Sequence, residues 1–265
     1  MEHETLSMLC SPYTQEHLEL RTEVKPDGTS EEILVGVKTG ERFPFRNGIP
    51  ILYDVSRLEG YNLQYNTFYR KTAKYYDMTL KMLAFFLGSG EAKFRSQYLQ
   101  LLEIRKDCKV LEVSVGTGTN LSLLPASAHS YGLDLSWEML SKCQKNMLRW
   151  NRKFELFFGN SETLPFRDGM FDVVFHVGGI NAFSDRAKAI NEMIRVARPG
   201  TKIVIVDETA KMMNSMGWIP SARKMVEEWG DRFEAPVNLV PATMREIQVN
   251  KMINGFFYIL SFRTP

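Results

Sequence analysis

Short apolar runs alternate with amphipathic segments along the second half of the chain. The runs have the length and composition of buried strands, and they lie at residues 107–113, 131–135, 154–158, 170–177 and 201–207. Two intervening segments, 136–150 and 186–197, place apolar residues at the three- and four-residue spacing of a helix. Strands that alternate with helices indicate a parallel sheet covered by helices. The pattern therefore predicts an α/β domain of the doubly wound kind over residues 106–265.

Two further segments complete this domain. Residues 244–252 and 256–262 alternate like strands around Asn254-Gly255, which predicts an antiparallel hairpin at the end of the sheet. Residues 211–235 are rich in methionine and tryptophan and precede that hairpin as an insertion. Such adaptable side chains suit a lid over a substrate, and an ordinary packed helix accounts for them equally well.

The first part of the chain has a different pattern. Residues 1–57 predict a small β-rich module, because two strand-like runs at 18–23 and 32–37 flank the turn Pro26-Asp27-Gly28 and a second hairpin signal follows at Asn47-Gly48. Residues 58–105 predict helices that carry many tyrosines, which either pack on the domain or cover its ligand site.

Composition narrows the function classes. The 265 residues are 44% apolar with a formal net charge of +2, which allows one full α/β domain and a small appendage and requires no polyanionic partner. Residues 1–60 hold six Lys or Arg and eleven Asp or Glu, so their net charge is 6 − 11 = −5. This acidity argues against the N-terminal module as a clamp for RNA.

The cysteines and the hydropathy suggest a compartment. Three cysteines form no Cys-x-x-Cys pair and no even framework, which indicates a reducing, cytoplasmic setting without disulfides. We expect no signal peptide and no transmembrane segment, because the longest apolar patch (82–87) is far shorter than the ~20 residues that span a bilayer. Peripheral contact with a membrane stays compatible with this pattern.

The candidate chemistry lies in a glycine-containing loop. Glu112 ends the first apolar run, and Gly116 and Gly118 follow in a loop where the backbone can approach a ligand closely. Asp134 lies 22 positions after Glu112 at the end of the next strand, where a carboxylate can accept hydrogen bonds from both ribose hydroxyls. The loop lacks the third glycine of a dinucleotide site, so another nucleoside-bearing cofactor is favoured.

These residues carry a resemblance to a known family. Glu-x-Ser-x-Gly-x-Gly at 112–118 resembles motif I of class I S-adenosylmethionine-dependent methyltransferases, with Ser114 in place of the first glycine. Residues 159–166 (Gly-Asn-Ser-Glu-Thr-Leu-Pro-Phe), 171–174 (Phe-Asp-Val-Val) and 198–200 (Arg-Pro-Gly) resemble later motifs of this family in the same order. The resemblance implies the Rossmann-like class I fold with a seven-stranded sheet and S-adenosylmethionine as cofactor. Tyr-Tyr-Asp at 75–77 is similar to an element of the ubiquinone and menaquinone C-methyltransferases.

The resemblance also implies a set of binding residues. It assigns ribose to Asp134, adenine flanks to Leu135 and Met139, and adenine readout to Asn160, whose amide can accept or donate. The full set of cofactor residues implied is Tyr76, Glu112, Ser114, Val115, Gly116, Thr117, Gly118, Asn120, Asp134, Leu135, Met139, Asn160, Ser161, Glu162 and His176.

The N-terminal module resembles the zinc-ribbon-like module found with some methyltransferases. Only Cys10 stands near a ligand position, and Pro12 and Tyr13 stand where a second cysteine is expected. One thiol and His17 cannot build a tetrahedral zinc site, so we predict a module without metal.

Catalysis and the acceptor are less defined by sequence. His176 and Asn181, at the exit of the fourth strand of the domain, are the candidates for a general base and for orienting the acceptor, with Asp207 and Glu208 next. The favoured function is methyl transfer to a small molecule, with a lipophilic quinone or phenol as the family's suggestion and no nucleic-acid partner. Two alternatives stay open: methylation of rRNA or tRNA bases, and a cofactor-binding regulatory subunit without catalysis. The oligomeric state stays open as well.

Overall fold

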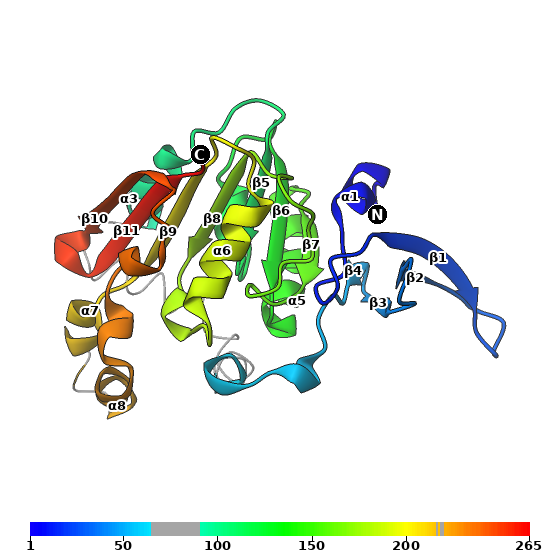
Figure 1. Cartoon of the computed structure of the whole chain (residues 1–265), viewed down its shortest axis with the longest axis horizontal. Coiled ribbons are helices and arrows are strands. Elements are labelled where there is room, and N and C mark those ends of the chain that lie inside the picture. Colours follow the sequence, from blue (N-terminus) through cyan, green and yellow to red (C-terminus); the bar gives the residue numbers. More distant parts are fainter. Residues whose placement is uncertain (65–90, 216, 218–219) are drawn as a thin grey trace.

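The computed structural model describes residues 1–64, 91–215, 217 and 220–265, and its centre is a seven-stranded sheet with the order β10-β11-β9-β8-β5-β6-β7 (Figure 1). The strands are β5 (Lys109–Val113), β6 (His129–Asp134), β7 (Glu155–Phe158), β8 (Val173–Val177), β9 (Lys202–Glu208), β10 (Arg245–Met252) and β11 (Phe257–Arg263). Strands β5 to β9 pair in parallel, and β11 pairs antiparallel with both β9 and β10. The predicted α/β class and the predicted terminal hairpin are confirmed.

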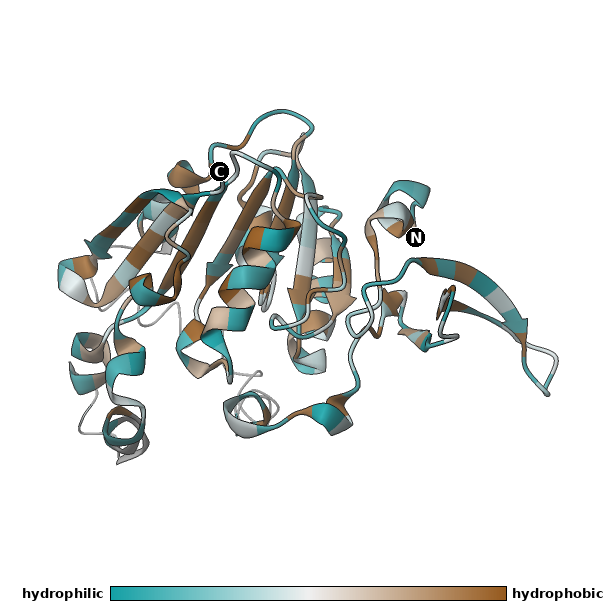
Figure 2. Ribbon diagram, viewed as in Figure 1, coloured by the Kyte–Doolittle hydropathy of each residue, from teal (hydrophilic) through white to brown (hydrophobic). Residues whose placement is uncertain are grey.

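Helices cover both faces of this sheet. α3 (Glu91–Leu99), α4 (Thr119–Ser122) and α5 (Trp137–Trp150) lie on one face and α6 (Arg186–Val196) on the other, while α7 (Ala210–Ser215) and α8 (Pro220–Trp229) lie beyond the end of the sheet (Figure 1). Ile190 and Met193 of α6 pack on the face that carries Leu111, while Leu140 of α5 packs on the opposite face with Val110. Because successive side chains of β5 point to opposite faces, one strand serves both halves of the core. Figure 2 shows the resulting apolar strands between helices with polar outer faces.

The helix ends follow local chemistry. Ser136 caps α5 by accepting a hydrogen bond from the Met139 amide at 3.3 Å, as its position predicts. Asp185 caps α6 in the same manner through the Lys188 amide at 2.9 Å. The end of the segment expected to be helical, 58–105, is only partly so, because α3 ends at Leu99 and continues only as the 3-10 turn Gln100–Leu102.

The insertion at 211–235 consists of α7, α8 and the 3-10 turn Gly230–Phe233. Trp229 and Phe233 stack at 5.7 Å between ring centroids and are buried with Ala182 and Met213. The insertion therefore has a small apolar core of its own next to the loop that follows β8. None of the helices in the described part of the chain has the length and hydrophobicity needed to cross a bilayer.

The N-terminal residues form the helix α1 (His3–Met8) and a four-stranded antiparallel sheet of β1 (Leu18–Val24), β2 (Ser30–Gly36), β3 (Arg42–Arg46) and β4 (Ile49–Pro50). This sheet joins the edge of the large one, because Ile51 pairs in parallel with Phe158 of β7 and the Leu52 amide donates to the Phe158 carbonyl at 2.8 Å. Figure 1 shows the two sheets side by side at this edge. Their cores are continuous rather than separate.

Polar side chains tie the loop at residues 11–16 to the turn at residues 38–41. Ser11 Oγ donates to Glu41 Oε2 at 2.6 Å, and the Glu16 carboxylate accepts hydrogen bonds from the amides of Lys38 and Thr39. Burial raises the pKa of the Cys10 thiol to about 12, so this thiol stays neutral and is a poor metal ligand. Within the described residues, no group of three or more His, Cys, Asp or Glu is arranged to hold a metal ion.

Candidate functional site

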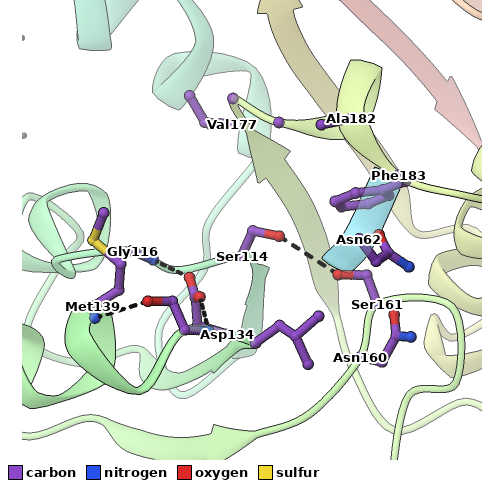
Figure 3. Close-up of a pocket in the computed structure, with 14 residues that line it drawn as sticks. Asn62, Ser114, Gly116, Asp134, Met139, Asn160, Ser161, Val177, Ala182 and Phe183 are labelled. Atoms are coloured by element: carbon purple, nitrogen blue, oxygen red, sulfur yellow. Dashed lines mark hydrogen bonds between the residues drawn. The ribbon is translucent and has the colours of Figure 1, made fainter. Parts of the chain in front are cut away.

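A pocket that opens to solvent lies at the carboxyl ends of β5, β6, β7 and β8 (Figure 3). In an open α/β sheet, ligands bind in the crevice at this end of the strands. The residues that line it are Asn62, Ser114, Gly116, Asp134, Leu135, Ser136, Met139, Asn160, Ser161, Val177, Gly178, Gly179, Ala182 and Phe183. Seven of the residues predicted to bind a cofactor are in this set, namely Ser114, Gly116, Asp134, Leu135, Met139, Asn160 and Ser161.

The glycine loop turns sharply after β5. Ser114, Gly116 and Gly118 have φ angles of 61°, 55° and 79°, so the serine adopts the left-handed conformation that its glycine counterpart would adopt more easily. A Cβ on Gly116 would meet no atom within 4 Å, which leaves open space beside that residue of the pocket wall. A Cβ on Gly118 would lie 2.5 Å from Cys143 Sγ, so Gly118 is required for packing against α5. The two glycines thus serve different purposes.

Asp134 fixes this loop to the end of β6. Its Oδ2 accepts a hydrogen bond from the Gly116 amide at 2.8 Å, and its Oδ1 accepts one from the Ser136 amide at 2.8 Å. Burial raises the pKa of Asp134 to about 6, although backbone hydrogen bonds from Ser136, Gly116 and Leu135 oppose this shift. A carboxylate has about four lone-pair positions. These backbone contacts leave capacity for a hydroxyl donor in the pocket that Asp134 lines.

Asn160 follows β7 on the other side of the pocket. Its Oδ1 accepts a hydrogen bond from the Glu162 amide at 2.9 Å. The oxygen is therefore engaged, and among the described residues its Nδ2 has no partner. This arrangement favours the donor role of the amide over the acceptor role, so Asn160 suits a ring nitrogen of a base better than an amino group.

Seven of the predicted cofactor residues in the described part of the chain do not line the pocket, namely Glu112, Val115, Thr117, Gly118, Asn120, Glu162 and His176. Several of them support the loop from behind. Tyr98 of α3 donates to Asn120 Oδ1 at 2.7 Å, and Asn120 Nδ2 donates to Glu112 Oε1 at 2.6 Å. Val115 packs against Gly132, and the Thr117 carbonyl accepts from Asn146 at 3.1 Å. Tyr76 lies outside the described residues.

His176 and Asn181, predicted as catalytic, also lie behind the pocket wall. His176 is fully buried (0% exposed), its Nδ1 lies 2.9 Å from the Val113 carbonyl, and burial lowers its pKa. Its ring packs against Phe183 at 5.1 Å between centroids. It therefore buttresses a lining residue, and neither the expected contact with a cofactor nor the role of a base is supported by this geometry.

Asn181 is held by three parts of the chain. Its side-chain Nδ2 donates to the backbone carbonyl of Glu208 at 2.9 Å, and its Oδ1 accepts from the Tyr258 hydroxyl at 3.2 Å. Its backbone amide donates to Asp207 Oδ2 at 2.9 Å. With both ends of the side chain engaged, Asn181 anchors the loop after β8. The expectation that it orients an acceptor finds no support in these contacts.

Sequence reasoning missed Asn62 and Phe183, which both line the pocket. Asn62 belongs to the segment before the domain and reaches the pocket only through the fold. Phe183 closely follows the Gly178-Gly179 pair, and a search for apolar residues after a strand exit could have found it. Together they close the side of the pocket that faces Ser161 (Figure 3).

The residues present fit a nucleoside-bearing cofactor. Asp134 keeps lone pairs for ribose hydroxyls, Asn160 keeps a donor for a base, and the missing Cβ of Gly116 leaves room beside the loop. Leu135 and Met139 provide apolar walls between these polar groups. Small-molecule sites commonly combine such walls with a few polar groups that set orientation.

Glu112 makes the stability of the loop depend on pH. Burial raises its pKa from 4.5 to about 8, so the folded protein keeps this proton where the unfolded chain has lost it. Stability therefore falls as pH rises through this interval and levels off above about pH 8. We expect the unfolding free energy of Glu112→Gln minus that of the wild type to grow by roughly 2–3 kcal/mol between pH 6 and pH 8 in urea denaturation. A difference that stays constant with pH would contradict the buried neutral acid.

Comparisons with known proteins agree with this geometry. Residues 111–205 match a family model described as a methyltransferase domain. The chain is 30% identical over 149 residues to a demethylmenaquinone methyltransferase of Bacillus licheniformis, covering 55% of this chain and 62% of that protein. It is 30% identical over 156 residues to the protein of the same name in Listeria monocytogenes, covering 57% and 63%. The chain thus spans less than two thirds of the length of these relatives.

Solved structures support the fold. A methyltransferase of Thermotoga maritima, described as a "possible histamine N-methyltransferase", matches with a TM-score of 0.55 at 17% identity, covering 74% of this chain and 98% of that one. A protein from Pyrococcus horikoshii matches with a TM-score of 0.52 at 16% identity, covering 65% and 92%. At these identities the likeness concerns the arrangement of strands and helices.

Proposed function

We propose that this chain, whose seven-stranded sheet carries a class I methyltransferase domain with S-adenosylmethionine as cofactor, methylates a small lipophilic acceptor of the phenol or quinol type. The observation that carries the proposal is the pocket between Gly116, Asp134 and Asn160 at the carboxyl ends of parallel strands. The demethylmenaquinone methyltransferases among its relatives support the class of acceptor. The three unpaired, buried cysteines agree with a cytoplasmic location, which we include in the proposal.

When bound, S-adenosylmethionine supplies a methyl group that its sulfonium charge has already activated. The acceptor atom forms a bond to the methyl carbon, the carbon–sulfur bond breaks with its electron pair going to sulfur, and the acceptor releases a proton. The chain's part is to orient the reactants and to exclude water. Asp134 would hold the ribose and Asn160 the base, while Val177, Ala182 and Phe183 make the wall beside them apolar.

No described histidine reaches this pocket, so we do not assign a general base to His176. A phenolate or a quinol anion needs less help, because it already carries the electron pair that attacks the methyl carbon. Positioning is then the main contribution of the protein.

The test is to incubate the purified protein with S-adenosylmethionine and a panel of lipophilic phenols and reduced quinones, and to measure S-adenosylhomocysteine. We expect product only with an acceptor present and none with Asp134→Ala. Binding of the cofactor without product across the panel would favour the regulatory-subunit alternative. Salt-sensitive methylation of RNA instead of the panel would favour the alternative of an RNA methyltransferase.

A further inference from the structure

Residues 59–64 dock on the loop that follows β8. The backbone amide of Asn62 donates to Ser184 Oγ at 3.1 Å, and the backbone amide of Ser184 donates to Asn62 Oδ1 at 3.3 Å. Ser184 Oγ also lies 3.1 Å from the backbone carbonyl of Glu59. Gly60 has a φ of 56°, and a Cβ there would lie only 3.1 Å from Ser184 Oγ. These reciprocal contacts join two segments that are about 120 residues apart in sequence.

The Asn62 side chain lines the pocket and contacts Glu162, which follows β7. It is 8% exposed and lines the pocket, and its Nδ2 donates to Glu162 Oε1 at 2.7 Å. The same oxygen of Glu162 accepts a hydrogen bond from the Asp185 amide at 2.9 Å. The Glu162 carboxylate is thereby fixed by Asn62 and by the N-terminal end of α6.

Glu162 in turn determines how Asn160 faces the pocket. The Glu162 amide donates to Asn160 Oδ1 at 2.9 Å, which turns Asn160 Nδ2 to the other side. Asn62, Asn160 and Ser161 surround one end of the pocket in Figure 3. Asn62 therefore contacts the Glu162 side chain, and the Glu162 backbone amide contacts Asn160.

Tyr61, next to Asn62, attaches residues 59–64 to the insertion at 211–235. The Tyr61 ring meets Trp229 edge to face at 5.5 Å, and the Arg232 guanidinium lies 4.4 Å from the Tyr61 ring centre. Arg232 Nε also donates to the Asn181 carbonyl at 2.8 Å. The insertion at 211–235 and residues 59–64 thus support each other over the loop that carries Ala182 and Phe183.

We infer that Asn62 is a positioning residue of the cofactor site, which closes the pocket on the side of the base and fixes the Asn160 amide through Glu162. This inference rests on the proposed function, since it assumes that the pocket holds the adenosine of S-adenosylmethionine. It assigns a binding role to a residue outside the region of family motifs. Removing the side chain opens the wall and releases Glu162, whereas the loop at 114–118 and Asp134 keep all their contacts.

The experiment compares the wild type with Asn62→Ala, Asn62→Asp and the double variant Asn62→Asp with Glu162→Gln. Calorimetry gives the Kd for S-adenosylhomocysteine and for 5′-methylthioadenosine, which lacks the amino-acid part. We expect both ligands to bind Asn62→Ala about 10-fold more weakly, by the same factor, because the lost contacts lie at the base. KM for S-adenosylmethionine should rise while kcat stays within about twofold.

Asn62→Asp places two carboxylates in contact and should weaken binding further than alanine does. The double variant reverses donor and acceptor between the two side chains, but the new glutamine amide also faces the Asp185 backbone amide, so it should bind more tightly than Asn62→Asp and less tightly than the wild type. Gln64→Ala, on the exposed side of the same segment, is the control that should leave binding unchanged.

All variants are measured below the lowest unfolding midpoint of the set, so that binding is compared between folded proteins. Wild-type Kd values for Asn62→Ala and Asn62→Asp would overturn the inference, and so would a double variant that folds but binds no more tightly than Asn62→Asp. Absence of binding by the wild type is a different outcome, because it would overturn the proposed cofactor site itself.

Discussion

Asp134→Ala should weaken the binding of S-adenosylmethionine at least about 100-fold, which corresponds to roughly 2.7 kcal/mol. The carboxylate accepts hydrogen bonds from the backbone amides of Gly116 and Ser136 at 2.8 Å each, and Asp134 lines the pocket. Its removal leaves two backbone donors without their acceptor and takes away the partner of the ribose hydroxyls. The site then loses a ligand contact and the restraint on the glycine loop together.

Isothermal titration calorimetry with S-adenosylmethionine and S-adenosylhomocysteine measures this effect directly. Asp134→Asn helps to separate the ligand contact from the restraint on the glycine loop. The asparagine side-chain oxygen can still accept one hydrogen bond from a backbone amide, while its side-chain nitrogen faces the other backbone amide without accepting from it. Asp27→Ala, in the exposed turn between β1 and β2, is the matched control and should bind like the wild type. A Kd for Asp134→Ala within threefold of the wild-type value would show that Asp134 is not at the ligand.

Phe166→Ala should lower the free energy of unfolding by about 3–5 kcal/mol. The ring is fully buried and meets Phe157 and Phe171 edge to face, at 5.0 and 4.9 Å between centroids. Its backbone bridges to Leu9, so the same residue joins the N-terminal module to the large sheet. The substitution leaves a cavity at this junction.

Urea denaturation followed by circular dichroism gives the free energy, and limited proteolysis reports whether residues 1–57 are released first. Phe166→Leu keeps most of the volume and should cost about 1–2 kcal/mol. Leu148→Ala removes an apolar side chain that is 84% exposed, and its change should stay within about 0.5 kcal/mol. A loss below about 1 kcal/mol for Phe166→Ala would mean that this junction is not part of the cooperative core.

The N-terminal module illustrates what local patterns cannot provide. Its strands and turns are predicted by alternation and by Asn47-Gly48, because those signals act between neighbours in the chain. Its attachment through Ile51 to Phe158 depends on an open edge at β7, which exists only once the sheet is assembled. The hydrogen bonds by which Ser11 and Glu16 join the loop at 38–41 are likewise contacts between segments distant in sequence.

The candidate site residues also divide into those that local patterns predict and those that they do not. Ser114, Gly116, Asp134 and Asn160 were predictable, because each lies at a strand end whose position the apolar runs and the motif spacing mark. Strand-exit position was not enough for His176, since the alternation of β8 turns that ring away from the pocket and into the core.

The sequence by itself determined the α/β class, the order of strands and helices, and the side of the sheet where the ligand binds, because these follow from hydrophobic periodicity and from glycine and carboxylate positions along the chain. Only the tertiary structure decided which polar side chains face the pocket and which support it. Asn62 enters the pocket, and Asn120 and Asn181 leave it for buried partners. The physical reason is that a buried polar group must find its hydrogen-bond partner, and those partners come from segments far away in sequence.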